Sequence, residues 1–174
     1  VPPKGYLKRI REICDKHGIL LIFDEVITGW GRTGSVFAAQ EWNVTPDIMT
    51  MAKATTNGVV PMGVVAVKED IYDSVLDASS APEGTPELFH GYTYSGIPVA
   101  VAAALAVQDI FDKEDIFKRA MEMSPYLQSG LQSLKDLKEI VSIRGYGMMG
   151  GIEMKMKEKP GKAGFQTFKH CYDA

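Results

Sequence analysis

The stretch GYLKRIREICDKHGILLIF, residues 5–23, decides the fold class of this chain. Its first part has apolar residues at helical spacing and charged residues on the other side, which predicts an amphipathic helix that stops at His17-Gly18. Its last part, ILLIF (19–23), is an unbroken apolar run, as expected of a parallel strand covered on both faces. A helix that leads by a tight turn into such a strand indicates an α/β architecture.

Two more short strands are expected on either side of a polar loop that contains Lys53. Residues 47–51 (DIMTM) precede this loop and residues 62–67 (MGVVAV) follow it. Residues 77–88, rich in Pro, Ser and acidic side chains, predict a surface loop. Further along, EIVSIR (139–144) and GGIEMKM (150–156) predict two strands joined by a glycine-rich turn.

The second half of the chain is expected to contain helices. IPVAVAAALAV (97–107) predicts a buried helix with Pro98 near its start, where the missing N–H costs little. Residues 114–138 predict a longer amphipathic helix, interrupted near Ser124-Pro125 because proline breaks the hydrogen-bond ladder. The last residues, 163–174, have the pattern of a helix that ends partway. This ending, with Val rather than Met as the first residue, predicts an excised piece of a longer protein.

Composition excludes several classes of protein. The 174 residues are 45% hydrophobic and 24% charged, which is typical of a globular domain. The net charge of −3 leaves no basic excess for nucleic acid. The longest apolar run, residues 97–107, is shorter than the ~20 residues that cross a bilayer, so no membrane partner is expected. Cys14 and Cys171 lack metal-ligand spacing, which predicts no metal site and a reducing, cytoplasmic compartment.

Three motifs have the chemistry of a site, and each has a second, purely structural interpretation. The Asp24-Glu25 pair follows a predicted buried strand, where α/β sheets present functional groups, but capping or ion-paired acids also occur there. GWGRTG (29–34) and GYGMMG (145–150) formally match a dinucleotide fingerprint. Neither has the required strand before it and helix after it, so both matches are interpreted as accidental.

Lys53 is the third candidate, in the uncharged stretch MAKATTNG (51–58). An amine whose pKa is lowered by burial or by a nearby cation can condense with an aldehyde. A solvated loop lysine is the structural alternative, and composition alone favours it.

Taken together, the motifs resemble a known family. FDEVITGWGRTG (23–34), PDIMTMAKATTNGVVPMGVVAV (46–67), HGYTYSGIPVA (90–100) and IRGYGMMGGIEM (143–154) occur in the order and approximate spacing of the class III aminotransferases. The resemblance extends over essentially the whole chain and is strongest to the omega-amino-acid:pyruvate branch, which includes beta-alanine:pyruvate transaminases. It implies part of the large domain of a fold type I transferase that depends on pyridoxal 5'-phosphate.

The resemblance also implies a role for each matching residue. Asp24 matches the aspartate that pairs with the cofactor's pyridine nitrogen and keeps it protonated. Val26 matches the residue packed on one face of the ring. Lys53 matches the lysine that forms the internal aldimine and, once freed, moves a proton between the substrate α-carbon and the cofactor.

Two further residues match family positions that do not contact the cofactor ring. Thr93 matches a threonine whose hydroxyl reaches the cofactor phosphate of the neighbouring subunit, so the resemblance implies a homodimer with a shared active site. Arg144 matches an arginine that binds a substrate carboxylate through two parallel hydrogen bonds. A surface arginine at a strand end remains the alternative for Arg144.

The sequence departs from the family pattern in three respects. Position 97 is Ile where many relatives have His, a change that bears on packing near the interface, and AKATTNG is an unusual form of the lysine loop. The N-terminal part of the family, with its phosphate loop and stacking aromatic residue, has no counterpart here. We therefore expect this chain alone to bind the cofactor weakly or not at all.

The leading hypothesis is a transaminase that moves an amino group from an amine or omega-amino acid to a keto acid such as pyruvate, by a ping-pong mechanism. An aminomutase is possible within the same fold, and a decarboxylase or racemase ranks lower. The alternative from another class is a truncated, catalytically silent product or interaction module. Residues 1–112 are expected to belong to the large domain, and residues 113–174 to an interdomain helix and the start of the small domain.

Overall fold

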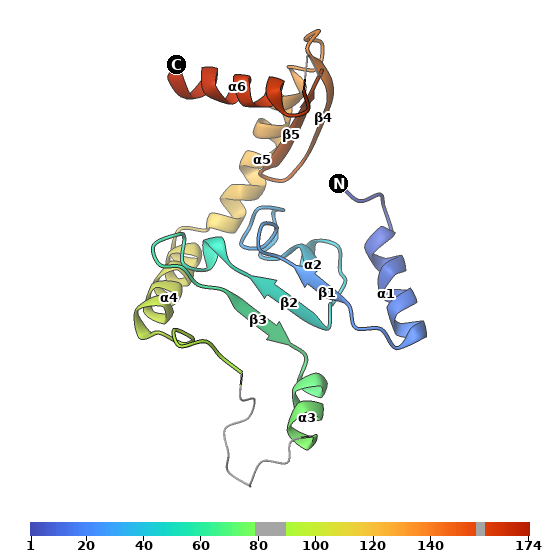
Figure 1. The fold of residues 1–174 in the computed structure, drawn as a ribbon, viewed down its shortest axis with the longest axis vertical. Helices are drawn as coiled ribbons and strands as arrows, with labels where there is room; N and C mark the ends of the chain where they lie inside the picture. Colours follow the sequence, from blue (N-terminus) through green and yellow to red (C-terminus); the bar gives the residue numbers. More distant parts are fainter. Residues whose placement is uncertain (79–89, 156–158) are drawn as a thin grey trace.

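The computed structural model describes residues 1–78, 90–155 and 159–174 of the chain (Figure 1). Helices and strands are mixed along it, as the α/β prediction requires. The helices are α1 (Tyr6–His17), α2 (Ala38–Glu41), η1 (Lys53–Thr55), α3 (Glu69–Asp77), α4 (Pro98–Lys113), α5 (Ile116–Gln132) and α6 (Lys162–Asp173). The strands are β1 (Ile22–Asp24), β2 (Ile48–Met51), β3 (Val64–Val67), β4 (Ile140–Tyr146) and β5 (Met149–Met154). None of the helices described is long and apolar enough to span a membrane.

The first sheet has the order β1-β2-β3, and α1 lies beside its β1 edge (Figure 1). Strands β1 and β2 are parallel, whereas β2 and β3 are antiparallel. Asp24 at the end of β1 pairs with Thr50 in β2, and Thr50 pairs with Val65 in β3. The carboxyl ends of β1 and β2 therefore meet at one edge of the sheet.

Helix α1 ends where the sequence predicts. Gly18 adopts the left-handed conformation at φ 62°, and the N–H of Ile19 donates to the carbonyl of Cys14, which closes the helix. The helix packs through its apolar side against the start of the sheet. The small core there consists of Cys14, Leu21 and Val44, with Leu7, Ile10 and Phe23 against it.

The strand expected at residues 19–23 is shorter and begins later. Its partner β2 begins at Ile48, just after Pro46, which has no N–H to donate to a ladder. Pairing starts at Leu21, whose carbonyl accepts from Asp47 and Ile48, and Ile19 and Leu20 stay outside the strand. Ile22 is 57% exposed, so the residues that the structure describes do not supply the cover expected on both faces of this strand.

The long helix expected at residues 114–138 is also different. Helix α5 begins at Ile116 and ends at Gln132, and Pro125 lies inside it without ending it. The expected interruption occurs instead at Asp115, whose φ of 49° separates α4 from α5. Side chains on either side of Pro125 offset the lost hydrogen bond, because Ser124 and Gln128 both donate to the carbonyl of Gly147.

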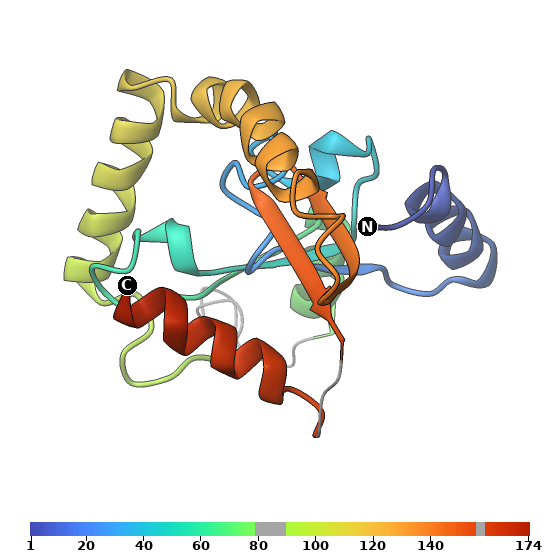
Figure 2. The ribbon, with the colours of Figure 1, turned by 90° about the horizontal axis from the view of Figure 1, so that it is seen from above.

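Strands β4 and β5 form a separate antiparallel hairpin that lies between α5 and α6 (Figure 2). Three helices, α2, α3 and the short η1 in the Lys53 loop, were not predicted from the sequence. The acidic first turn of α3, Glu69 and Asp70, is a start signal that could have identified it. Of the loop expected at residues 77–88, Asp77 ends α3 and residues 79–88 lie outside the described part, as does residue 156 of the last predicted strand.

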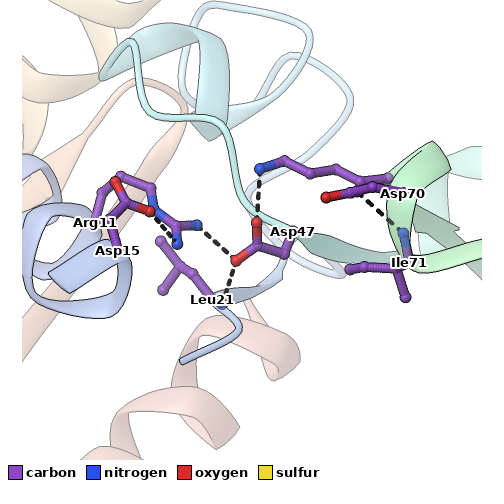
Figure 3. A network of polar contacts seen from close by, with 7 residues as sticks. Arg11, Asp15, Leu21, Asp47, Asp70 and Ile71 are labelled. Atoms are coloured by element: carbon purple, nitrogen blue, oxygen red, sulfur yellow. Dashed lines mark hydrogen bonds and ion pairs between the residues drawn. The ribbon is translucent and has the colours of Figure 1, made fainter. Parts of the chain in front are cut away.

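Asp47 joins three segments at the amino end of β2 (Figure 3). Its Oδ2 accepts from Arg11 in α1 and from the N–H of Leu21, both at 2.7 Å, and its Oδ1 accepts from Lys68 at 2.6 Å. Burial alone would raise the pKa of this carboxyl, but the hydrogen bonds from Leu21, Lys68 and Arg11 outweigh it, so the pKa is held well below its usual range. This network fixes α1 and β3 to the centre of the sheet.

Candidate active site

The end of β1 presents Asp24 at the carboxyl edge of the sheet. Its side chain is exposed, and its Oδ1 accepts a hydrogen bond from the N–H of Val26 at 3.0 Å. Within the described part of the chain, its other carboxylate oxygen has no hydrogen bond or ion pair. Asp24 is therefore free to accept a hydrogen bond from a protonated ring nitrogen of a ligand.

Lys53 follows β2 at the same edge, three positions after Thr50, the partner of Asp24. Its φ is 51°, a left-handed conformation that is unusual for a residue other than glycine and is typical of functional sites. Its side chain is exposed and makes no ion pair or hydrogen bond to any residue that the structure describes. The amine is thus available to a ligand.

Two buried threonines, Thr55 and Thr56, hold the loop that carries Lys53. Thr55 accepts a hydrogen bond from the indole N–H of Trp30 and donates to the carbonyl of Ala52, both at 3.0 Å. Thr56 donates to the carbonyl of Val60 at 2.5 Å. These contacts fix the backbone on both sides of Lys53. Sequence reasoning missed this support, although the adjacent threonines of this loop were a usable signal.

A hollow of about 560 Å³ opens at this edge, within the size range of cofactor sites. Val26 and Ala52 line it, next to the two candidate residues Asp24 and Lys53, and the first turn of α4 closes one side. Tyr92 and Tyr94 also line it, whereas Thr93 between them is exposed and does not. The full lining is Val26, Thr50, Met51, Ala52, Pro61, Met62, Gly63, Val64, Val65, Tyr92, Tyr94, Ser95, Gly96, Ile97, Ala100 and Val101.

Glu25, unlike Asp24, has a structural role. It is 1% exposed, and its carboxylate accepts from the N–H groups of Ala38 and Ala39 and from the hydroxyl of Thr28. These are unpaired donors at the start of α2, which a carboxylate stabilises. Glu25 therefore has the capping role that was one interpretation of the acidic pair. Asp24 is the residue of the pair that remains a candidate for a functional role.

The two glycine-rich motifs pack against each other rather than around a phosphate. The N–H of Met148 donates to the carbonyl of Arg32 at 2.8 Å, and a Cβ at Gly147 would lie 2.3 Å from that carbonyl oxygen. Neither motif opens a helix after a strand in the manner of a dinucleotide site. Their glycines allow two backbones from distant parts of the chain to touch.

Arg144 lies in β4, away from the first hollow. It borders a second hollow of about 370 Å³ together with Thr28 and Tyr146. Its side chain is 63% exposed, and among the described residues it forms an ion pair with Glu153 at 3.5 Å, a loose contact that leaves the guanidinium available. The segment 24–28 borders both hollows, through Val26 on one side and Thr28 on the other. The structure thus brings Asp24, Val26 and Lys53 to one edge and Arg144 to the adjoining hollow.

A tyrosine–glutamate pair that sequence reasoning missed joins the hairpin to α2. The hydroxyl of Tyr146 donates to Oε1 of Glu41, and Ser35 donates to Oε2 of Glu41 at 2.8 Å. The Tyr146 ring packs on Trp42 at a centroid distance of 5.1 Å. The hydrogen bond to Glu41, and then burial, raise the pKa of Tyr146 to about 12, so it remains a donor throughout the neutral range.

Comparison with known proteins identifies the family. The sequence model of the class-III aminotransferases matches residues 1–171, and the chain belongs to this family. It is 48% identical to an omega-aminotransferase of Caulobacter vibrioides, over 99% of this chain and 39% of the relative. It is 45% identical to an omega-amino acid–pyruvate aminotransferase of Pseudomonas putida, over 97% of this chain and 38% of the relative. The chain thus spans about two fifths of the length of these relatives.

The fold agrees with that assignment. The structure matches an (S)-enantioselective omega-transaminase from Thermomicrobium roseum with a TM-score of 0.82 and 42% identity, covering 89% of this chain and 33% of that one. The architecture is that of part of the large domain of fold type I transferases, as the resemblance of the motifs implies.

Proposed function

We propose that this chain supplies the lysine-bearing part of the active site of a pyridoxal-phosphate-dependent aminotransferase. The complete enzyme would move an amino group from an amine or omega-amino acid to a keto acid such as pyruvate. One observation carries the proposal: in a class-III aminotransferase chain, parallel pairing of β1 and β2 brings the exposed side chains of Asp24 and Lys53 to the same sheet edge, beside a hollow lined by Val26. Class-III members use pyridoxal phosphate.

The chemistry of these residues fits that cofactor. Asp24 would accept a hydrogen bond from the ring nitrogen and hold its proton there, and Val26 would pack on one ring face. Lys53 would hold the group through Nζ and, when released by the substrate amine, would take the proton from the substrate carbon that bears the amino group. Bound pyridoxal phosphate supplies the electron sink for the carbanion that this proton transfer leaves.

The proposal extends to the substrate and the partner subunit. Arg144 would bind a substrate carboxylate, which a loosely paired and exposed guanidinium supports. Thr93 would donate from its hydroxyl to a phosphate oxygen in a second copy of the enzyme, since it is exposed and does not line the hollow of its own chain. We accordingly propose a homodimer with a shared site.

We also propose two features of organisation. Residues 1–112 would belong to the large domain and residues 113–174 to the interdomain helix and the start of the small domain, on the ground that the two sheets are separate and α5 begins at Ile116. A cytoplasmic location is proposed because both cysteines, Cys14 and Cys171, are free thiols.

The test is reduction of the complete protein with borohydride after addition of pyridoxal phosphate, followed by peptide mapping. We expect one labelled lysine, Lys53, and loss of the absorbance band and of transamination in Lys53→Ala. Lys8→Ala, at an exposed lysine on α1, is the matched control and should keep both. Label on another lysine, or full activity in Lys53→Ala, would refute the role of Lys53. A complete protein with no band and no transamination would instead favour a catalytically silent member of the family.

A further inference from the structure

Lys53 is held in a backbone conformation that its side chain disfavours. Its φ is 51°, in the left-handed region that favours glycine because a Cβ crowds the backbone there. Such a conformation persists only where the surrounding structure imposes it. The contacts that impose it on Lys53 therefore bear on where its amine can lie.

The peptide groups on either side of Lys53 are both hydrogen-bonded. The carbonyl of Ala52 accepts from the N–H of Thr55 at 3.1 Å and from the Thr55 hydroxyl at 3.0 Å. The carbonyl of Lys53 accepts from the N–H of Gly58 at 3.3 Å. Thr55 is 3% exposed, so its hydroxyl depends on protein partners rather than on water. Thr55 therefore closes the turn around Lys53 with two of these three bonds.

Trp30, on the loop after β1, orients the hydroxyl of Thr55. That hydroxyl has one proton, which it donates to Ala52, and its oxygen accepts from the indole N–H of Trp30 at 3.0 Å. Trp30 is itself left-handed at φ 61°, which is exceptional for a bulky residue. One chain of hydrogen bonds thus links two residues in a disfavoured conformation.

Aromatic rings restrain the indole. Trp30 packs on Phe37 at a centroid distance of 5.1 Å and on Phe111 of α4 at 5.9 Å. Phe117 of α5 packs on Phe111 at 5.1 Å, and a Cβ at Gly31 would lie 2.8 Å from the Phe117 ring. A side chain restrained in this way loses little further freedom when it donates a hydrogen bond. The indole is therefore a fixed point for the Lys53 loop.

We propose that Trp30 is a positioning residue for cofactor attachment: acting through Thr55, it keeps Lys53 in the left-handed conformation from which its amine meets the aldehyde of pyridoxal phosphate. This inference rests on the proposed function of Lys53. Attachment forms a carbon–nitrogen double bond, and the aldehyde oxygen leaves with two hydrogens of the amine as water. A merely structural role for Trp30 would change the melting temperature and leave attachment as it is.

The test measures attachment in the complete enzyme rather than turnover. Cofactor-free protein is titrated with pyridoxal phosphate, and borohydride reduction with peptide mapping gives the fraction of Lys53 that is labelled. For Trp30→Phe, which keeps a ring in the cluster, the half-labelling concentration should rise roughly 5-fold, as for the loss of one hydrogen bond. For Thr55→Val, which also removes the contact with Ala52 and leaves the indole unpaired, it should rise roughly 10- to 50-fold.

The cofactor-free protein gives a second readout. Amide hydrogen exchange over residues 52–58 should be faster in both variants than in the wild type, because the turn around Lys53 then opens more readily. Exchange in α1, which lies at the opposite edge of the first sheet from β3, should stay unchanged. The first readout reports attachment, and the second reports the loop that carries the lysine.

Three further variants make the test specific. Thr55→Ser keeps both the donor and the acceptor, so its half-labelling concentration should stay within about threefold of wild type. Trp30→Phe added to Thr55→Val should cause no further loss, because the indole acts through that hydroxyl. Trp42→Phe is the matched control, since this tryptophan packs on Tyr146 and its indole makes no hydrogen bond to the described residues. It should leave half-labelling unchanged.

The outcomes separate this inference from the proposed function. Unchanged half-labelling in Trp30→Phe, or a further loss when it is added to Thr55→Val, would overturn the positioning role and leave Lys53 as the attachment site. A wild-type enzyme labelled at another lysine, or at none, would overturn the proposed function and this inference with it. Should Thr55→Val fail to fold, seen as a lost melting transition, Trp30→Phe against Trp42→Phe decides the question.

Discussion

Asp47 is the residue on which the position of α1 depends. Its carboxylate is almost fully buried and binds Arg11, Lys68 and the backbone of Leu21 (Figure 3). For Asp47→Asn we expect a loss of about 3 kcal/mol in the free energy of unfolding at neutral pH, because a buried ion pair loses one partner. The measurement is a urea unfolding curve, with Asp73→Asn, at an exposed position of α3, as the control that should change little.

The same network predicts how stability depends on pH. The folded pKa of Asp47 lies below its unfolded value of about 3.9, so its contribution is fully present above that value and is lost as pH falls toward the folded pKa. The difference between wild type and Asp47→Asn should therefore be constant from about pH 7 to pH 5 and should shrink below about pH 4. A difference that grows on acidification would contradict this assignment.

Individual site residues differed in how far they could be predicted. Asp24 and Lys53 lie in motifs that match the family in order and spacing, so the resemblance predicted their roles, whereas the residue pattern alone favoured a solvated loop lysine at position 53. Glu25 could not be separated from Asp24 by sequence, because its role depends on the start of α2, which the sequence pattern did not indicate. The Tyr146–Glu41 pair joins positions 105 residues apart, and no local pattern specifies such a contact.

At the scale of elements, the contact between the two glycine-rich motifs makes a sharp prediction. Gly147 has φ 57°, and a Cβ there would lie 2.3 Å from the carbonyl of Arg32. We expect Gly147→Ala to destabilise the protein by at least about 2 kcal/mol, through overpacking and an unfavourable backbone conformation.

Gly130 provides the matched control. It lies within α5, and a Cβ there would meet nothing within 4 Å, so Gly130→Ala should stabilise the helix by up to about 1 kcal/mol. Thermal melts of the two variants should shift in opposite directions. Equal shifts would mean that the close approach at Gly147 is not required by the fold.

The sequence alone located some ends of helices and strands correctly and missed others. The end of α1 depends on Gly18, a local signal, and was predicted correctly. The start of β1 depends on where its partner β2 can begin to pair, and the continuity of α5 past Pro125 depends on contacts with the hairpin. Both are tertiary effects, which override local preference.

For the molecule as a whole, the open face of the first sheet has consequences in solution. Ile22, Ile48 and Val67 are paired in register and form one apolar row, in which Ile22 is 57% and Val67 45% exposed. We expect the purified 174-residue chain to self-associate as concentration rises, seen by light scattering coupled to size exclusion. Ile22→Lys with Val67→Lys should reduce association more than Thr45→Lys, an added charge at an exposed polar site. A monodisperse monomer at all concentrations would refute this expectation.

The hydrogen bond between Glu41 and Tyr146 also has a consequence for folding while the chain is being synthesised. The two residues are 105 positions apart, and a ribosome adds roughly 5–20 residues each second. During synthesis, Glu41 therefore waits roughly 5 to 20 s for its partner, longer than most small domains need to fold. Over that interval the carboxylate of Glu41, at the end of α2, has no tyrosine partner, so the contact between α2 and the hairpin can form only after most of the chain has been synthesised.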